Sequence, residues 1–238
     1  MKALLIVTFS VLGAMLHAQS VDDDMLAGLT ALKKNDNRAA GVAFDRAVAN
    51  DPTNGKTWYY RAVNRMVIGD NDGALEDLDH LIGMEPGDVH AMLRRAEVYR
   101  IKGDDRSANA DLYRVLGLHH NGPAAEHALF ELGRIAMEEK DLPNALAHYD
   151  RLIAIAPYNA LAWCDRGIAR NVLRDDDKAI LDLEKAIDLD PTLDQAYVNL
   201  AIVLFRQDRK QEGCHALQQA RDLGDRTVEE LMMVHCDR

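Results

Sequence analysis

The sequence predicts an all-α fold of about six repeated helical hairpins, closed by a short helix at the C-terminal end. Apart from Pro143, the prolines of the chain lie 34, 37, 34 and 34 residues apart. A large residue lies six positions after each of these prolines, and small residues lie ten and twenty-two positions after it. A fixed period of this length is typical of helical repeat arrays. The periodic prolines are Pro52, Pro86, Pro123, Pro157 and Pro191.

Each period contains two amphipathic helices. In the second period, "KTWYYRAVNRMVIG" has apolar residues at helical spacing and ends at Gly69, and "GALEDLDHLIGMEP" ends at Pro86. Proline cannot continue a helix, and it disfavours helix in the preceding residue. Small side chains are expected where two helices cross closely. The large positions are Trp58, Met92, Leu129, Trp163 and Tyr197, and the small ones are Ala62, Ala96, Gly133, Gly167, Ala201, Ala40, Ala74, Ala108, Ala145, Ala179 and Gly213.

Together, the large, small and closing proline positions resemble the tetratricopeptide repeat, a helix–turn–helix of 34 residues. The resemblance covers essentially the whole chain after residue 18 and implies a right-handed α-solenoid over residues 19–225. The first repeat departs from the pattern at Asp24, and the third has three extra residues around "GLHHNG". The repeats are predicted over residues 21–54, 55–88, 89–125, 126–159, 160–193 and 194–225, with a capping helix over 226–238.

The N-terminal residues have the pattern of a secretory signal peptide. Lys2 precedes an apolar run from Ala3 to Leu16, and cleavage is expected after Ala18, so the signal peptide is predicted over residues 1–18. This run is short for a membrane span, and no second apolar run of membrane length follows. The sequence therefore predicts an exported protein, periplasmic or secreted, and the alternative is an N-terminus retained in a membrane.

Composition limits the classes of function. Of the 238 residues, 48% are hydrophobic, which is enough for a folded core. The net charge of −11 argues against a nucleic-acid partner, because phosphate binding needs clustered lysine and arginine.

Arginine and aspartate occur together in three repeats. Arg61, Arg95 and Arg166 precede the first small position, and an aspartate lies sixteen residues after each one, at Asp77, Asp111 and Asp182. The two positions lie at equal distances from the turn of an antiparallel hairpin, so we expect three ion pairs within hairpins. Each would contribute about 1 kcal/mol or less if exposed. The alternative is that the arginines bind an anionic ligand.

Two of the three cysteines are expected to pair. Cys214 begins the second helix of repeat six, and Cys236 ends the capping helix, so a short turn would bring them side by side. A disulfide there is expected in an oxidising compartment and would stabilise the fold by roughly 3 kcal/mol. The alternative is two buried thiols, and Cys164 is expected to stay unpaired.

The sequence contains no convincing catalytic or metal-binding constellation. His119 and His120 lie in the inserted loop, and neither a carboxylate nor a cysteine completes a ligand set with nearby His127. The stretch "GDNDG" at 69–73 lacks the glutamate that closes a calcium loop. We therefore expect no cofactor and no enzyme activity, and a metal-dependent enzyme using the histidines is the minor alternative.

The family resemblance implies that the first helix of each repeat lines a concave face. Positions 2, 5, 9 and 12 of that helix share one side, because steps of three and four residues stay on one face. The C-terminal part of this face is apolar, which favours binding of a peptide or helix from a partner protein. The alternative is that the capping helix covers Ile202 and Phe205. The residues at these positions are Lys56, Tyr59, Val63, Met66, His90, Leu93, Glu97, Arg100, His127, Phe130, Arg134, Met137, Leu161, Cys164, Ile168, Asn171, Gln195, Val198, Ile202 and Phe205.

One subfamily of these repeats binds a C-terminal carboxylate through inward lysine and asparagine side chains. Tyr59 and Val63 occupy those positions here, and Arg94 alone does not restore the motif. The sequence thus predicts a non-catalytic scaffold that binds an unidentified protein partner outside the cytoplasm. The alternative is a structural subunit of a homo-oligomer or an envelope complex.

Overall fold

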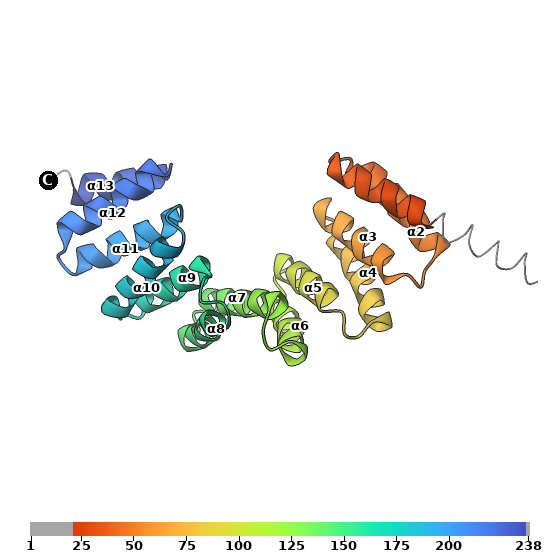
Figure 1. The fold of residues 1–238 in the computed structure, drawn as a ribbon, viewed down its shortest axis with the longest axis horizontal. Coiled ribbons are helices and arrows are strands. Elements are labelled where there is room, and N and C mark those ends of the chain that lie inside the picture. The colour runs from red at the N-terminus through yellow and green to blue at the C-terminus, as the bar shows by residue number, and fades with distance from the viewer. Residues whose placement is uncertain (1–20, 237–238) are drawn as a thin grey trace, which may run out of the picture. The chain divides into compact units, whose positions relative to one another are not determined.

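The structure, a computed structural model, describes residues 21–236, and within this range it contains helices and turns but no strand (Figure 1). The predicted signal peptide over residues 1–18 lies outside the described residues. The all-α class predicted from the sequence is confirmed.

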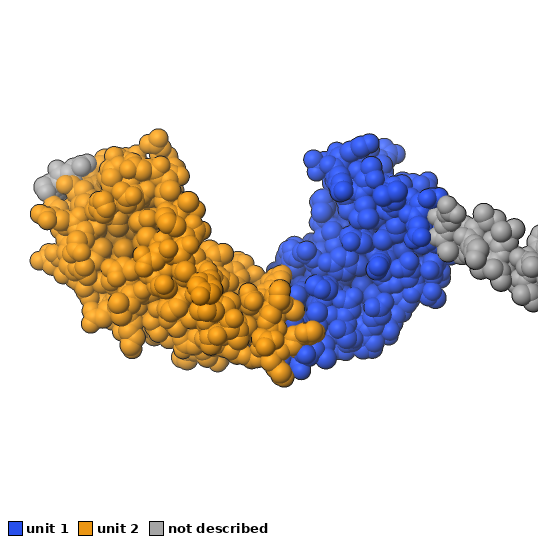
Figure 2. Space-filling model, in the orientation of Figure 1, with its two compact units in different colours: residues 1–118 blue, residues 119–238 orange. Residues whose placement is uncertain are grey.

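The chain forms two compact units, residues 1–118 and 119–238 (Figure 2). In both, helices pack against their neighbours along the chain, and from α3 to α12 they pack most extensively within the hairpins α3–α4, α5–α6, α7–α8, α9–α10 and α11–α12, as the hairpin pattern predicts. The first unit contains a helix over 21–33, then α2 (Asn37–Asn50), α3 (Gly55–Val67), α4 (Asn71–Met84), α5 (Val89–Ile101) and α6 (Asp105–Leu118). The second contains α7 (Pro123–Glu138), α8 (Leu142–Ile155), α9 (Ala160–Val172), α10 (Asp176–Leu189), α11 (Asp194–Arg206), α12 (Lys210–Asp222), the 3₁₀ helix η1 (Arg226–Val228) and α13 (Glu229–His235).

The turn inside each hairpin has one recurrent conformation. The second residue after the first helix has a positive φ, and glycine provides it without strain in two hairpins, at Gly69 and Gly103. The next residue is commonly an aspartate whose side chain accepts a hydrogen bond from a backbone amide of the second helix, as Asp70 does from Gly73. This residue pair ends one helix and begins the next. The equivalent left-handed residues in the other hairpins are Asn35, Lys140, Arg174 and Asp208.

The small positions allow side chains of the paired helix to approach the backbone. All of the predicted small positions are buried. A Cβ placed on Gly133 would lie 2.5 Å from Cε1 of the Tyr149 ring, and one on Gly167 would lie 2.8 Å from Cγ of Leu183. Because these rings and branches fill the hairpin interior, a larger residue would push the two helices apart.

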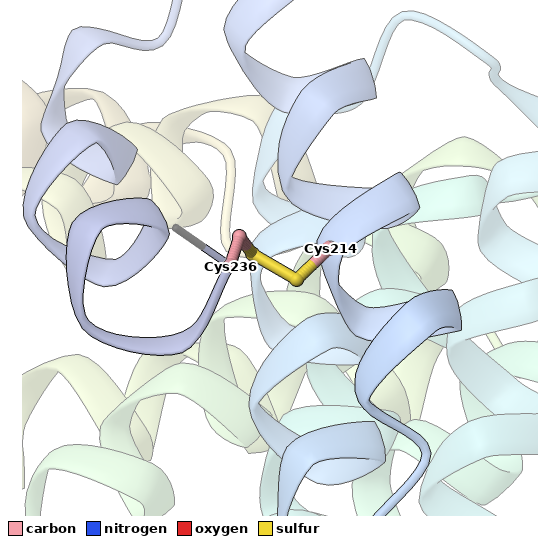
Figure 3. Close-up of a disulfide and its surroundings, with 2 residues drawn as sticks. All are labelled: Cys214 and Cys236. Atoms are coloured by element: carbon pink, nitrogen blue, oxygen red, sulfur yellow. A yellow bond between two sulfur atoms is a disulfide. The ribbon is translucent and has the colours of Figure 1, made fainter. Parts of the chain in front are cut away.

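The C-terminal end differs in one detail from the expected single helix over 226–238. The segment begins as the 3₁₀ turn η1, whose Val228 is fully buried, and continues as α13. A disulfide joins Cys214 on α12 to Cys236 after α13, with the two Cα atoms 5.7 Å apart (Figure 3). The bond holds α13 against the last hairpin. Cys164 is a free, buried thiol, and burial raises its pKa to about 12.

Candidate functional site

The arginines of three hairpins form buried ion pairs with the aspartates expected from the sequence. Nη2 of Arg61 lies 2.7 Å from Oδ1 of Asp77, and Nε donates to the other carboxylate oxygen at 2.9 Å. The equivalent Nη2–Oδ1 distance is 2.7 Å in the other two pairs, Arg95–Asp111 and Arg166–Asp182. The three aspartates are at most 4% exposed. The small contribution to stability expected for an exposed ion pair, about 1 kcal/mol or less, therefore does not apply to these pairs.

Each of these arginines also contacts the preceding hairpin. Nη1 of Arg61 donates to Asp45 at 3.1 Å, and Nη1 of Arg166 donates to Asp150 at 2.6 Å. Nη1 of Arg95 donates in the same way to Asp79 at 2.6 Å. We call each set of one arginine and its two aspartates an arginine bridge. Sequence reasoning missed the second aspartate, although it lies sixteen residues before the arginine in all three repeats.

Two of the arginine bridges also include the large tryptophan of the repeat. The guanidinium carbon of Arg61 lies 4.8 Å from the centre of the Trp58 ring, and that of Arg166 lies 4.7 Å from Trp163. These arginines are therefore occupied by two carboxylates and an aromatic ring. Their geometry supports a structural role and does not support the alternative in which they bind an anionic ligand.

In the first unit, the predicted concave-face residues Lys56, Tyr59 and His90 line a cavity of about 670 Å³. The Tyr59 ring meets Tyr60 edge to face, with the ring centres 5.5 Å apart. Arg94 donates to the Tyr59 hydroxyl at 3.4 Å and to Glu97 at 2.8 Å. The guanidinium group of Arg94 is thus hydrogen-bonded to side chains of its own unit. It is not part of a site for the C-terminal carboxylate of a partner, in agreement with the missing lysine and asparagine.

The remaining first-unit positions differ in accessibility. Val63 and Met66 are half-buried, and Arg100 pairs with Asp105 at 3.2 Å. The prediction that Leu93 lines an accessible face is wrong, because this side chain is only 8% exposed.

In the second unit, the structure brings four predicted positions, Arg134, Met137, Ile168 and Gln195, around a cleft of about 200 Å³. Glu138, Tyr149 and Asp165 complete its lining. We refer to this cleft, together with the partly buried Phe130 and Val198 and the exposed Ile202 on α7 and α11, as the second-unit inner face.

Two residues of this cleft, Tyr149 and Asp165, were missed by sequence reasoning. The Tyr149 hydroxyl donates to Oδ2 of Asp165 at 3.4 Å. Burial raises the pKa of Asp165 to about 6, and burial together with the nearby Asp165 carboxylate raises the pKa of Tyr149. The cleft therefore combines apolar walls with a carboxyl group whose pKa is raised by burial.

The C-terminal end of the predicted face is only partly accessible. Ile202 is 37% exposed. The prediction that Phe205 lines an open groove is wrong, since its ring stacks on His235 of α13 with the ring centres 4.4 Å apart. The alternative in which the capping helix covers Ile202 and Phe205 therefore holds in part, for Phe205 but not for Ile202. Asn171 accepts a hydrogen bond from Arg206 at 2.8 Å.

The possible metal ligands are dispersed. His119, His120 and His127 are exposed, and residues 21–236 contain no group of three side chains arranged to hold a metal ion. The acidic stretch at 69–73 forms the turn between α3 and α4, where Asp70 caps the second helix. In the same range of residues, no helix has both the length and the apolar character needed to cross a membrane.

Comparison with known families agrees with this geometry. Models described as tetratricopeptide repeat match residues 103–160 and 132–198. The chain is a tetratricopeptide repeat protein. Its repeats explain the 34-residue period, the small residues at helix crossings and the closing prolines.

Among curated proteins, the chain is similar to two kinds of repeat protein. It is 32% identical over 98 residues to the small glutamine-rich tetratricopeptide repeat-containing protein 2 of Saccharomyces cerevisiae, matching 41% of this chain and 28% of that protein. It is 24% identical over 235 residues to the tetratricopeptide repeat and J domain-containing co-chaperone DNJ1 of Cryptococcus neoformans, matching 92% of this chain and 45% of that protein. The chain thus spans less than half the length of these relatives.

Solved structures confirm the right-handed α-solenoid fold class. Pseudomonas aeruginosa pilF matches with a TM-score of 0.76 and 12% identity, covering 92% of this chain and 98% of that one. PilW, described as a type IV pilus biogenesis factor, matches with a TM-score of 0.74 and 16% identity, covering 91% and 98%. At these identities the likeness concerns the fold.

Proposed function

We propose that this chain is a non-catalytic protein-interaction module that binds an extended or helical segment of a partner protein on the second-unit inner face. A role as an interaction scaffold is supported by membership of the tetratricopeptide repeat family and by relatives that include a co-chaperone. The identity of the partner does not follow from these relatives, because the chain spans less than half of each.

The observation that carries the proposal is the composition of the second-unit inner face. Met137 and Ile168 supply apolar walls to its cleft, while Arg134 and Asp165 supply charges of both signs. Ile202 adds an exposed aliphatic side chain on α11. Apolar anchors surrounded by polar groups that fix orientation are typical of surfaces that bind peptides.

We propose that the protein acts outside the cytoplasm. Residues 1–18 have the composition of a secretory signal peptide. The Cys214–Cys236 disulfide fits an oxidising compartment, where such bonds persist. Cell fractionation of the native protein would test the location, and recovery in the cytoplasm with two free thiols at these positions would contradict it.

A crosslinking pull-down from native cells tests the binding face. The variant Phe130→Ala, Ile202→Asp changes the inner face and is expected to lose the partners that the unaltered protein captures. The matched control Leu181→Asp changes a side chain that is 64% exposed on α10, the second helix of its hairpin, and should capture the same partners. If the inner-face variant folds and still captures them, the proposed face is wrong.

Light scattering separates this proposal from the alternative of a homo-oligomer. A monomer that captures other proteins agrees with the scaffold. A stable oligomer that dissociates on Ile202→Asp would instead assign the inner face to a second copy of the chain.

A further inference from the structure

The sixth repeat lacks an arginine bridge, and a cavity of about 400 Å³ lies at its place. The cavity is formed by α10, α11 and α12 of the second unit. The buried residues Leu200, Leu204 and Ala216 line it, together with the more exposed Tyr197 and Glu184.

The fifth repeat shows what normally fills this position. Residues thirty-four positions earlier are Arg166 and Arg170, where the sixth repeat has Leu200 and Leu204. Both arginines there donate to Asp182, at 2.7 Å each, and Ala216 replaces that aspartate in the sixth repeat. The change removes two guanidinium groups and their buried carboxylate together, so the space they fill elsewhere is open.

The outer half of the bridge is retained in the sixth repeat. Glu184 corresponds to Asp150, the outer acid of the fifth-repeat bridge, and Tyr197 corresponds to Trp163, the ring beneath its guanidinium. The cavity therefore keeps an acid and an aromatic face but has lost the cation that lies between them.

The acids at the rim are available to a cation from outside the chain. Glu184 and Asp188 line the cavity, are exposed, and form no salt bridge with any other residue of the described chain. Glu212 is different, because Arg209 holds both of its carboxylate oxygens, at 2.8 and 2.6 Å. Arg209 also lies near enough to Glu184 to feel its charge, but its donors are directed at Glu212.

We propose that this cavity, the vacant arginine slot, accepts an arginine side chain from a partner protein. The guanidinium would lie over the Tyr197 ring and pair with Glu184, as Arg166 does with Trp163 and Asp150. The methylene stem would contact Leu200 and Leu204, since arginine covers apolar surface with its stem while its charged end stays hydrated.

The vacant arginine slot is separate from the second-unit inner face. Leu200 and Leu204 are four residues apart and share one side of α11, whereas Val198 and Ile202 are each offset from them by two residues. Two residues of an α-helix turn through about 200°, so the two pairs face opposite directions. The inference therefore stands independently of the proposed function.

Amide chemical-shift mapping of the full chain tests the slot with n-butylguanidinium as the probe. We expect saturable shifts at millimolar probe, centred on Tyr197, Leu200 and Ala216. The neutral n-butylurea, which has the same shape, should give no saturable shifts there. Glu184→Gln should weaken n-butylguanidinium binding about fivefold, the value of an exposed ion pair. The matched control Asp150→Asn removes an equivalent acid from an occupied bridge and should leave binding unchanged.

A refilled variant provides the decisive comparison. Leu200→Arg, Ala216→Asp restores the bridge residues of the other repeats and should abolish the n-butylguanidinium shifts. The proposal is overturned if the two probes bind alike, if no saturable shifts occur, or if the refilled variant binds as before. If circular dichroism shows that the refilled variant is unfolded, the test is the Glu184→Gln variant. Unchanged affinity of this variant for n-butylguanidinium overturns the proposal.

Discussion

Removing the buried carboxylate of one arginine bridge should destabilise the second unit strongly. Asp182 accepts hydrogen bonds from Arg166 at 2.7 and 2.8 Å and from Arg170 at 2.7 Å. Its side chain is 3% exposed, and those of the arginines are 12% and 18% exposed. Asp182→Ala would leave two largely buried cations without this partner.

The size of the loss follows from what the arginines keep. Breaking a buried ion pair by removing one partner costs about 3–5 kcal/mol. Arg166 retains its contact with Asp150, and both guanidinium groups keep some contact with solvent. We therefore expect the lower end of the range, about 3 kcal/mol of unfolding free energy.

The sixth repeat shows how the loss can be repaired. The triple variant Arg166→Leu, Arg170→Leu, Asp182→Ala installs the residues found at Leu200, Leu204 and Ala216. Replacing a buried ionic group by apolar residues is often neutral for stability. The triple variant should recover most of the loss, about 2 kcal/mol or more, despite the open slot that it leaves.

Urea unfolding followed by tryptophan fluorescence measures both variants. In a Trp58→Phe background the signal comes from Trp163, which lies in the altered hairpin. Circular dichroism on the same samples shows whether the two units unfold together. A cost below about 1 kcal/mol for Asp182→Ala, or a triple variant no more stable than the single one, would refute the reasoning.

Three further predictions concern single features of the fold. Reducing the Cys214–Cys236 bond should lower the free energy of unfolding by roughly 3 kcal/mol. Hydrogen exchange should then increase first at the amides of α13. A uniform loss of protection along the chain would contradict the role of the disulfide in holding α13. Gly133→Ala should cost about 1–3 kcal/mol in urea unfolding, because its Cβ meets the buried Tyr149 ring, and an unchanged midpoint would show that the ring can move. Folding raises the pKa of Asp165 to about 6, so ionisation of this carboxyl group lowers the free energy of unfolding as the pH rises from about 4 to 6. Asp165→Asn should therefore raise the free energy of unfolding by up to about 3 kcal/mol at pH 7 and by little at pH 4. An equal increase at both pH values would show that ionisation of Asp165 is not the cause.

The hairpins and their pairing could be predicted because the same helix contacts recur in every repeat. Gly133 and Gly167 are small for the reason that the pattern indicates, a close approach between the two helices of a hairpin. Arg61 and Asp77 could be paired from their equal distances to the turn. The contact of Arg61 with Asp45 was missed because it joins two successive hairpins. Equal distances from a turn predict contacts within one hairpin only.

The accessibility of single residues could not be predicted from helical position. Leu93 and Phe205 occupy two of the positions assigned to the concave face, but Leu93 is buried and the ring of Phe205 stacks on His235 of α13. Tyr149 and Asp165 lie outside the four positions assigned to the concave face, so their place in the cleft depends on how deeply adjacent hairpins pack. That depth is set by the tertiary structure and not by the repeat period.

Site-specific photo-crosslinking tests the central claim, partner binding on the second-unit inner face, most directly. A benzophenone amino acid would be placed at Met137, in the cleft, and in a separate protein at Leu181 on α10. The account predicts that, in native cells, Met137 forms covalent adducts with a discrete partner protein and Leu181 does not. Adducts of the same partner at Leu181 but none at Met137 would contradict it.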